Sequence, residues 1–199
     1  MNRLACGSRA LAAAARRAAF RHARFLLPAL ALAAQPLAAR DWFFDDPSHL
    51  LCAGVGTVEL FDRDKALAWH AEFRPAWHYR HLRPWVFCGT GNHDCFYAAL
   101  GILVDLRLGD RWLLTPSFGG GYYDSDGFDL GFHAEFRSGL ELTHRFRNGH
   151  RLGVVFTHIS NGSLGDTNPG TETLSVIYAL PLDVLFGDKL RRSALSVQR

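Results

Sequence analysis

The sequence alternates between apolar and polar residues with a period of two, most clearly over residues 131–146. The apolar row of this segment consists of Phe132, Ala134, Phe136, Leu140 and Leu142. The other row consists of His133, Glu135, Arg137, Glu141 and Arg145. Alternate side chains of a β-strand point to opposite faces, so the segment predicts a strand with one apolar and one charged face. Burying unpaired charges in an apolar core is costly, which restricts the folds that can hold such a strand.

Further strand-like segments, separated by turn residues, precede and follow this one. They are residues 51–61, 66–75, 80–88, 95–107, 111–123, 150–160 and 172–182. Eight strands of about ten residues match the smallest outer-membrane barrels, whose strands need about 9–11 residues to cross the bilayer. We therefore predict an all-β fold: an eight-stranded antiparallel transmembrane β-barrel with lipid outside and paired charges inside.

A soluble β-sandwich or lipocalin-like barrel is the alternative fold, because alternation is expected there as well. Such a fold faces its polar side chains outward. It would then have difficulty placing both the charged row of residues 131–146 and the apolar row of residues 95–107. The membrane barrel accommodates both rows.

The connections predict the orientation of the barrel. Residues 108–110 and 147–150 have the composition of tight turns, whereas residues 89–94, 124–129 and 161–170 form longer polar loops. Barrels of this class have short periplasmic turns and longer extracellular loops, so the longer loops are expected at the cell surface. Tryptophans near strand ends are expected at the membrane interfaces. These are Trp42, Trp77, Trp85 and Trp112.

The N-terminal segment has the order of a secretory signal peptide. Arginines come first, followed by an apolar run over residues 25–34 and a small-residue stretch that ends at Ala39. We predict a signal peptide over residues 1–39, the barrel over 40–186 and a short basic C-terminal tail over 187–199. An amphipathic organellar presequence is the alternative for the leader.

Six arginines of the chain lie in the leader. The remainder therefore has more acidic than basic residues, and no nucleic-acid partner is expected.

Three cysteines lie in the predicted barrel. Cys88 and Cys95 could close a small loop through a disulfide in an oxidising compartment, which would leave Cys52 unpaired. His93 and Asp94 lie between them. Two cysteines at this spacing do not make a closed zinc site, so no metal is expected.

The residues with reactive side chains cluster around the loop over residues 161–170. His158 and Ser160 are two positions apart and therefore share a strand face, which is the apolar face. Glu172 begins the next strand, and a hairpin would return it beside them. Serine needs an adjacent base to act as a nucleophile, and an acid can fix the tautomer of that base. Ordinary loop and strand-end roles are the alternative for each residue.

An ester hydrolase also needs donors for the oxyanion of its tetrahedral intermediate. The side chain of Asn168 is one candidate donor. A backbone N–H from the turn formed by Asn161, Gly162 and Ser163 is the other. These residues are therefore the predicted oxyanion or substrate-binding group.

The motifs His158-Ile-Ser160-Asn161 and Asn168-Pro-Gly-Thr-Glu172 resemble the signature of the outer-membrane lipid A 3-O-deacylases (PagL-like). The resemblance implies an eight-stranded barrel in the outer membrane of a Gram-negative cell, with the active site facing the outer leaflet. It implies that Ser160 is the nucleophile, His158 the base and Glu172 the orienting acid, with Asn168 as an oxyanion donor.

The same resemblance implies release of the 3-hydroxyacyl chain at position 3 of lipid A in lipopolysaccharide, without a metal or organic cofactor. Homodimers occur among members of the family. The chain departs from the family at Ser163, where a glycine is expected.

Two other functions are alternatives to the deacylase. One is a non-enzymatic barrel acting as an adhesin, stress barrel or minor pore, and the other is an outer-membrane phospholipase.

Overall fold

The computed structural model describes residues 42–183 apart from residues 62–64, 93–94 and 128. The predicted signal peptide and the basic tail over residues 187–199 lie outside the described residues and stay predictions. The described chain forms β1 (Leu50–Val58), β2 (Ala66–Arg74), β3 (Arg83–Gly91), β4 (Cys95–Leu103), β5 (Leu106–Arg107), β6 (Trp112–Ser125), β7 (Ala134–Arg145), β8 (Arg151–Ser160) and β9 (Thr171–Pro181).

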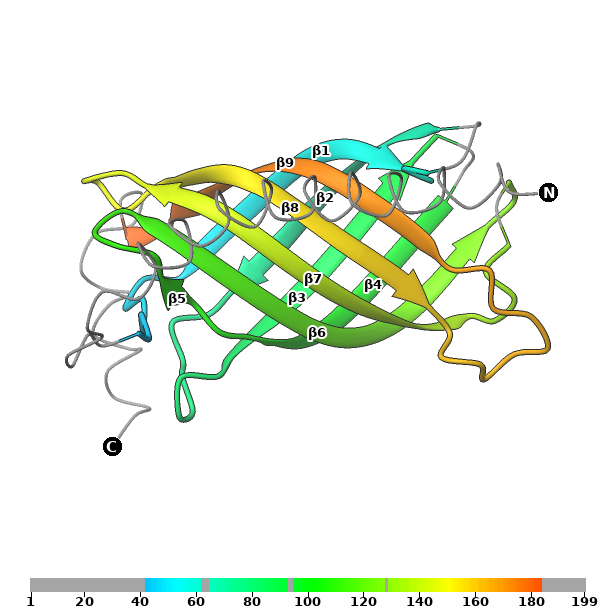
Figure 1. Ribbon diagram of the computed structural model, residues 1–199, viewed down its shortest axis with the longest axis horizontal. Helices are drawn as coiled ribbons and strands as arrows, with labels where there is room; N and C mark the ends of the chain where they lie inside the picture. The colour runs from blue at the N-terminus through cyan, green and yellow to red at the C-terminus, as the bar shows by residue number, and fades with distance from the viewer. Residues whose placement is uncertain (1–41, 62–64, 93–94, 128, 184–199) are drawn as a thin grey trace, which may run out of the picture. The chain divides into compact units, whose positions relative to one another are not determined.

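All strand pairs in this sheet are antiparallel, and the sheet closes on itself (Figure 1). The first strand, β1, pairs with both β2 and the last strand, β9. The ring is completed where β4 pairs with β6, while the short β5 pairs only with the start of β6. Among the described residues, eight strands therefore form a closed barrel, which confirms the predicted fold class. No helix of the described chain is long and apolar enough to cross a membrane.

The two faces of the barrel differ in polarity as predicted. The outer face is apolar and includes Leu51, Val55, Leu67, Val86, Leu100, Phe118, Leu140, Val154 and Val176, all exposed. The inner face carries the buried charges Glu72, Arg74, Glu135, Arg137, Glu141 and Arg151. A soluble barrel would reverse this arrangement. Lipid outside and a polar interior therefore explain the alternation seen in the sequence.

Several of the buried charges are paired, in two groups. In the first group, on β2 and β7, Arg74 donates to Glu72 at 2.6 Å and to Glu141 at 2.5 and 3.2 Å. At one end, Arg151 donates to Asp105 at 2.8 and 3.0 Å and to Asp46 at 2.7 Å. These charge-assisted bonds make ionised side chains acceptable in the interior.

The barrel has two distinct ends. One, called here the terminal end, holds residues 42–49 and 182–183 and the turns between β2 and β3, β4 and β6, and β7 and β8. The other, called the loop end, holds the connections β1–β2, β3–β4, β6–β7 and β8–β9. The β8–β9 connection is the prominent orange loop in Figure 1. The predicted group of reactive residues lies at this loop end.

Two residues differ from the sequence-based expectation, His133 because β7 begins after it and Trp85 because its indole fits inside the barrel. His133 precedes β7 and is exposed, and its ring stacks on that of Tyr122 with centroids 5.2 Å apart. Trp85 points into the barrel, where its Nε1–H donates to the carbonyl oxygen of Ile102 at 3.0 Å. The other expected interfacial tryptophans, Trp42, Trp77 and Trp112, are exposed.

The disulfide between Cys88 and Cys95 is not present. Cys88 is exposed on the outer face of β3, whereas Cys95 lines the interior of the barrel at the start of β4. The expected loop over residues 89–94 is also shorter, because β3 extends to Gly91, which pairs with Cys95. The continued strand pairing turns the two sulfurs toward opposite faces.

We expect the ion pairs at the terminal end to stabilise the barrel at neutral pH and to lose this effect in acid. Burial by itself would raise the pKa of Asp105, but Arg151 and Arg83 offset this and hold the pKa below its ordinary value. Stabilisation by Asp105 is therefore complete above its unfolded pKa of about 4 and is lost as pH falls through the lower folded pKa.

We expect Asp105→Asn to lower the free energy of unfolding at pH 7 by about 3 kcal/mol, because it leaves Arg151 with an incomplete set of partners. Urea unfolding of the barrel refolded in lipid vesicles measures this difference. Asp110→Asn, in the adjacent exposed turn, is the matched control and should change little. Equal losses in the two variants would contradict the role of the ion pair.

Candidate active site at the loop end of β8 and β9

The register of two neighbouring strands brings His158 and Glu172 together. These residues are directly opposite each other in the β8–β9 pair. The Nδ1 atom of His158 lies 3.0 Å from Oε1 of Glu172, so an Nδ1–H donates to the carboxylate. This bond leaves Nε2 as the nitrogen that can accept a proton. Both side chains are partly exposed on the outer face.

Ser160 lies on the same outer face, at the last position of β8. Gly170 lies beside both His158 and Ser160. A Cβ built on Gly170 would lie 3.1 Å from His158 Cε1 and 3.6 Å from Ser160 Cβ. Gly170 also has a φ of 66°, a conformation that L side chains rarely adopt. A small residue at this position thus leaves space beside the imidazole and the hydroxyl.

The loop after Ser160 is fixed by a buried asparagine. Asn161 is fully buried, and its Nδ2 donates to the carbonyl oxygens of Leu130 at 2.9 Å and Thr167 at 2.7 Å. Its Oδ1 accepts from the N–H of Ser163 at 2.9 Å. Leu130 belongs to the β6–β7 connection and is also fully buried. The Asn161 side chain therefore ties two loops together and does not face the outer surface.

The amide groups near Ser160 are partly engaged. Asn168 accepts the N–H of Asn161 with its Oδ1 at 3.0 Å, which orients the side chain and leaves Nδ2 available as a donor. The N–H groups of Asn161 and Ser163 both donate to side-chain oxygens. Gly162 has a φ of 62° and Ser163 one of 66°. Ser163 therefore occupies a backbone conformation that favours glycine, the residue that the sequence resemblance leads us to expect there.

The structure thus brings His158, Ser160 and Glu172 to one outer patch. It places Asn168 beside them and Asn161 beneath the loop. Sequence reasoning did not identify Gly170 or Leu130 as parts of this arrangement. Gly170 belongs to the Asn168-Pro-Gly-Thr-Glu172 motif, so the glycine in that motif could have indicated it. No feature of the sequence pointed to Leu130, because its carbonyl oxygen accepts from Asn161 only when the two loops pack together.

The outer patch is bordered by apolar side chains. On β7, Phe136 is directly opposite Ser160, and Ser138 is directly opposite His158. Phe136 is exposed and stacks on Phe118, with ring centroids 6.1 Å apart. A Cβ built on Gly162 would lie 3.2 Å from the Phe136 ring, so the turn after Ser160 rests on this ring. Polar reactive groups therefore lie at the edge of an apolar, lipid-facing surface.

Comparisons with known proteins agree with this architecture. The chain matches solved structures of membrane barrels, including one titled as the crystal structure of the outer membrane enzyme PagL. That match has 18% sequence identity and a TM-score of 0.52, and it covers 66% of this chain and 99% of that chain. A de novo designed transmembrane β-barrel matches with 13% identity and a TM-score of 0.50, covering 69% and 99% of the two chains.

At these identities the structural matches show the fold alone. A search of curated proteins finds no match. The sequence profile of the lipid A 3-O-deacylase (PagL) family, however, matches residues 42–181, which is more than half of the chain and includes the whole loop-end patch. The chain therefore belongs to the lipid A 3-O-deacylase (PagL) family of outer-membrane β-barrel enzymes.

Proposed function

We propose that this protein removes the 3-hydroxyacyl chain at position 3 of lipid A by a serine-esterase mechanism. Ser160 is the nucleophile, His158 the general base and Glu172 the acid that orients the imidazole. The observation that carries the proposal is the 3.0 Å bond from His158 to Glu172, with Ser160 on the same face at the strand end. The proposal uses no metal or organic cofactor.

The first step makes an acyl-enzyme. Glu172 holds the proton of His158 on Nδ1, so Nε2 can accept the proton of the Ser160 hydroxyl. The Ser160 oxygen attacks the ester carbonyl carbon, and the carbonyl oxygen becomes an oxyanion. His158 then gives its new proton to the departing sugar oxygen at position 3. The acyl chain remains on Ser160, and the sugar leaves with a free hydroxyl.

The oxyanion needs donors that are already in place. We assign this role to Nδ2 of Asn168 and to the backbone N–H of Gly162. The bond from the Asn161 N–H to Asn168 Oδ1 supports this assignment, since it fixes the side chain that would donate. Asn161 acts through Asn168 and the loop, and is a positioning residue.

The second step releases the acid. Water attacks the acyl carbon while His158 accepts its proton, and the Ser160 oxygen then departs with a proton returned by His158. The products are a free 3-hydroxy fatty acid and the original serine.

The position of the reactive patch on the outer face fits a substrate embedded in the membrane. An acyl chain that lies against the apolar surface near Phe136 would reach Ser160 without leaving the lipid phase. Lipid A occupies the outer leaflet, so we propose that the loop end faces the cell exterior and the terminal end the periplasm. The longest connection between barrel strands, residues 161–170 between β8 and β9, lies at the loop end, and the longer loops of such barrels are extracellular, which supports this orientation.

Replacing triad residues should abolish deacylation and leave the barrel folded. We expect Ser160→Ala and His158→Ala to lower the rate by at least about 1,000-fold, and Glu172→Gln by at least about 100-fold. Mass spectrometry of lipid A from cells that produce each variant measures the loss of the 3-linked chain. The heat-dependent gel mobility of each variant checks folding.

Two outcomes of this experiment would change the proposal. If Ser160→Ala still removes the 3-linked chain at the normal rate, the triad is wrong. Purified protein should also be incubated with lipid A and with glycerophospholipids separately. Faster hydrolysis of the glycerophospholipids would favour the phospholipase alternative for the same residues.

Asn168→Asp separates the donor role of Asn168 from its role in the loop. An aspartate keeps an oxygen that can accept the Asn161 N–H but replaces the proposed donor by a second acceptor. We expect kcat to fall about 100- to 1,000-fold, the usual cost of losing an oxyanion donor. Asn168→Ala, which loses both groups, is the comparison. An active Asn168→Asp protein would rule out the oxyanion role.

Gly170→Ala tests the space beside the imidazole. The added methyl would lie 3.1 Å from His158 Cε1, at a φ of 66°, and should displace the ring from Ser160. A displacement of about 1 Å can cost roughly 100-fold in rate, and we expect a loss of this order. Gly109→Ala is the control, since Gly109 has a φ of 101° with no atom within 4 Å of the added Cβ. Similar activities of the two variants would refute this role of Gly170.

A further inference from the structure

The outer patch contains a second hydroxyl that the proposed mechanism does not use. Ser138 lies on β7, on the same outer face as Ser160, and is exposed. It is directly opposite Phe118 on β6 and His158 on β8. Directly opposite residues have Cβ atoms about 4.5–5.5 Å apart, so Ser138 lies beside the imidazole of the proposed base.

A hydroxyl is unusual at this position of the outer face. Among the described outward-facing residues of β6 to β9, Ser138 and Ser160 are the only serines or threonines. The next outward-facing row toward the terminal end is entirely apolar and consists of Pro116, Leu140, Phe156 and Leu174. Ser138 is therefore a polar position at the border of the lipid-facing surface.

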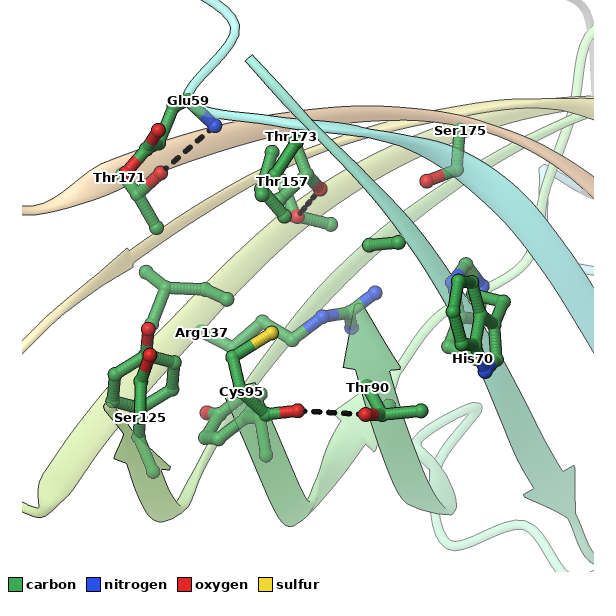
Figure 2. Close-up of a pocket in the computed structure, with 18 of the residues that line it drawn as sticks. Glu59, His70, Thr90, Cys95, Ser125, Arg137, Thr157, Thr171, Thr173 and Ser175 are labelled. Atoms are coloured by element: carbon green, nitrogen blue, oxygen red, sulfur yellow. Dashed lines mark hydrogen bonds between the residues drawn. The ribbon is translucent and has the colours of Figure 1, made fainter. Parts of the chain in front are cut away.

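The Ser138 hydroxyl makes no hydrogen bond to another described residue. Other threonine hydroxyls of the barrel do have partners. Thr90 donates to the carbonyl oxygen of Cys95 at 2.7 Å, and the hydroxyls of Thr157 and Thr173 bond each other on the inner face (Figure 2). A hydroxyl that faces hydrocarbon without a partner is unfavourable, so a membrane ligand that brings a polar group to Ser138 would gain a hydrogen bond.

The aromatic side chains near Ser138 leave it accessible from the membrane. The Phe118 ring stacks on that of Phe136, with centroids 6.1 Å apart and an interplanar angle of 12°. Phe136 is one outward-facing position nearer the loop end than Ser138. The Phe118 ring therefore leans toward the loop end and does not cover the serine.

The distance from Ser138 to the proposed nucleophile matches the substrate. Phe136 is directly opposite Ser160, so Ser138 is the diagonal neighbour of Ser160, roughly 7–8 Å away. When Ser160 attacks the ester, the carbonyl carbon becomes bonded to the serine oxygen, and the 3-hydroxyl oxygen of the acyl chain lies three bonds further on. A hydrogen bond of about 2.8 Å between the two hydroxyls spans the remainder.

We propose that Ser138 binds the 3-hydroxyl of the acyl chain and makes the enzyme select 3-hydroxyacyl esters. The inference rests on the esterase function proposed above. Beyond this hydroxyl the chain lies over Leu140 and Phe156, toward the middle of the membrane. An acyl chain without the hydroxyl leaves Ser138 unpaired against hydrocarbon, and a site built to bond a substrate hydroxyl rejects such an analogue. Ser138 determines specificity and takes no part in proton transfer.

Two synthetic glucosamine 3-esters test the proposal. They are identical except that only one acyl chain carries the 3-hydroxyl. The full mature protein is purified in detergent, and kcat/KM is measured for each ester. We expect the wild-type protein to prefer the hydroxylated ester about five- to tenfold, the usual size of one neutral hydrogen bond. Ser138→Ala should lower kcat/KM for the hydroxylated ester by the same factor and remove most of this preference.

Two further variants serve as controls. Ser138→Thr keeps a hydroxyl at the position and should retain most of the preference. Ser117→Ala removes a nearby hydroxyl that faces the interior, where a Cβ built on Gly139 would lie 2.6 Å from Ser117 Oγ, and should leave the preference unchanged. Heat-dependent gel mobility checks that each variant is folded.

Three results would overturn the proposal. An unchanged preference in Ser138→Ala would mean that the 3-hydroxyl bonds elsewhere. An equal loss on both esters would mean that Ser138 acts on His158 and not on the acyl chain. If the wild-type protein hydrolyses neither ester, the esterase function itself fails, an outcome distinct from the first two, in which the wild-type protein is active.

Discussion

The rest of the structure depends on the requirement that no backbone amide or carbonyl faces lipid unpaired. A sheet in a bilayer meets this requirement only when it closes, and here it closes through the β1–β9 and β4–β6 pairs. In the closed sheet each strand keeps one register with its two neighbours, which the apolar pattern and the turns specify. Since side chains alternate along each strand, the register then decides which residues face lipid and which face the interior.

This separation of faces gives one thin sheet two chemical surfaces. On the outer face, the β8–β9 register places His158 opposite Glu172, and β8 ends with Ser160 on that face. On the inner face, the same strands present Thr157 and Thr173 to the interior, where their hydroxyls bond each other. A reactive site toward lipid and a polar interior can therefore lie within one sheet thickness. The outer face limits the proposed substrate to molecules that lie in the membrane.

Most of the fold could be predicted from the sequence because lipid imposes a simple rule on each strand. The apolar row around Phe136 and the buried row of Glu135, Arg137 and Glu141 were both predicted from period-two alternation. The rule fails where a strand has not yet begun or where an aromatic residue fits either environment. His133 precedes β7 and is exposed, and Trp85 is buried with its N–H satisfied inside the barrel.

The sequence by itself determined the eight strands, the polarity of their faces and the presence of His158, Ser160 and Glu172 on one face. These features follow from local periodicity and from residue spacing along neighbouring strands. Only the tertiary structure decided that Cys88 and Cys95 point apart, that Asn161 is buried against Leu130, and that Arg74 pairs with both Glu72 and Glu141. Each of these outcomes depends on distances between segments far apart in the chain, which strand register and loop packing set together.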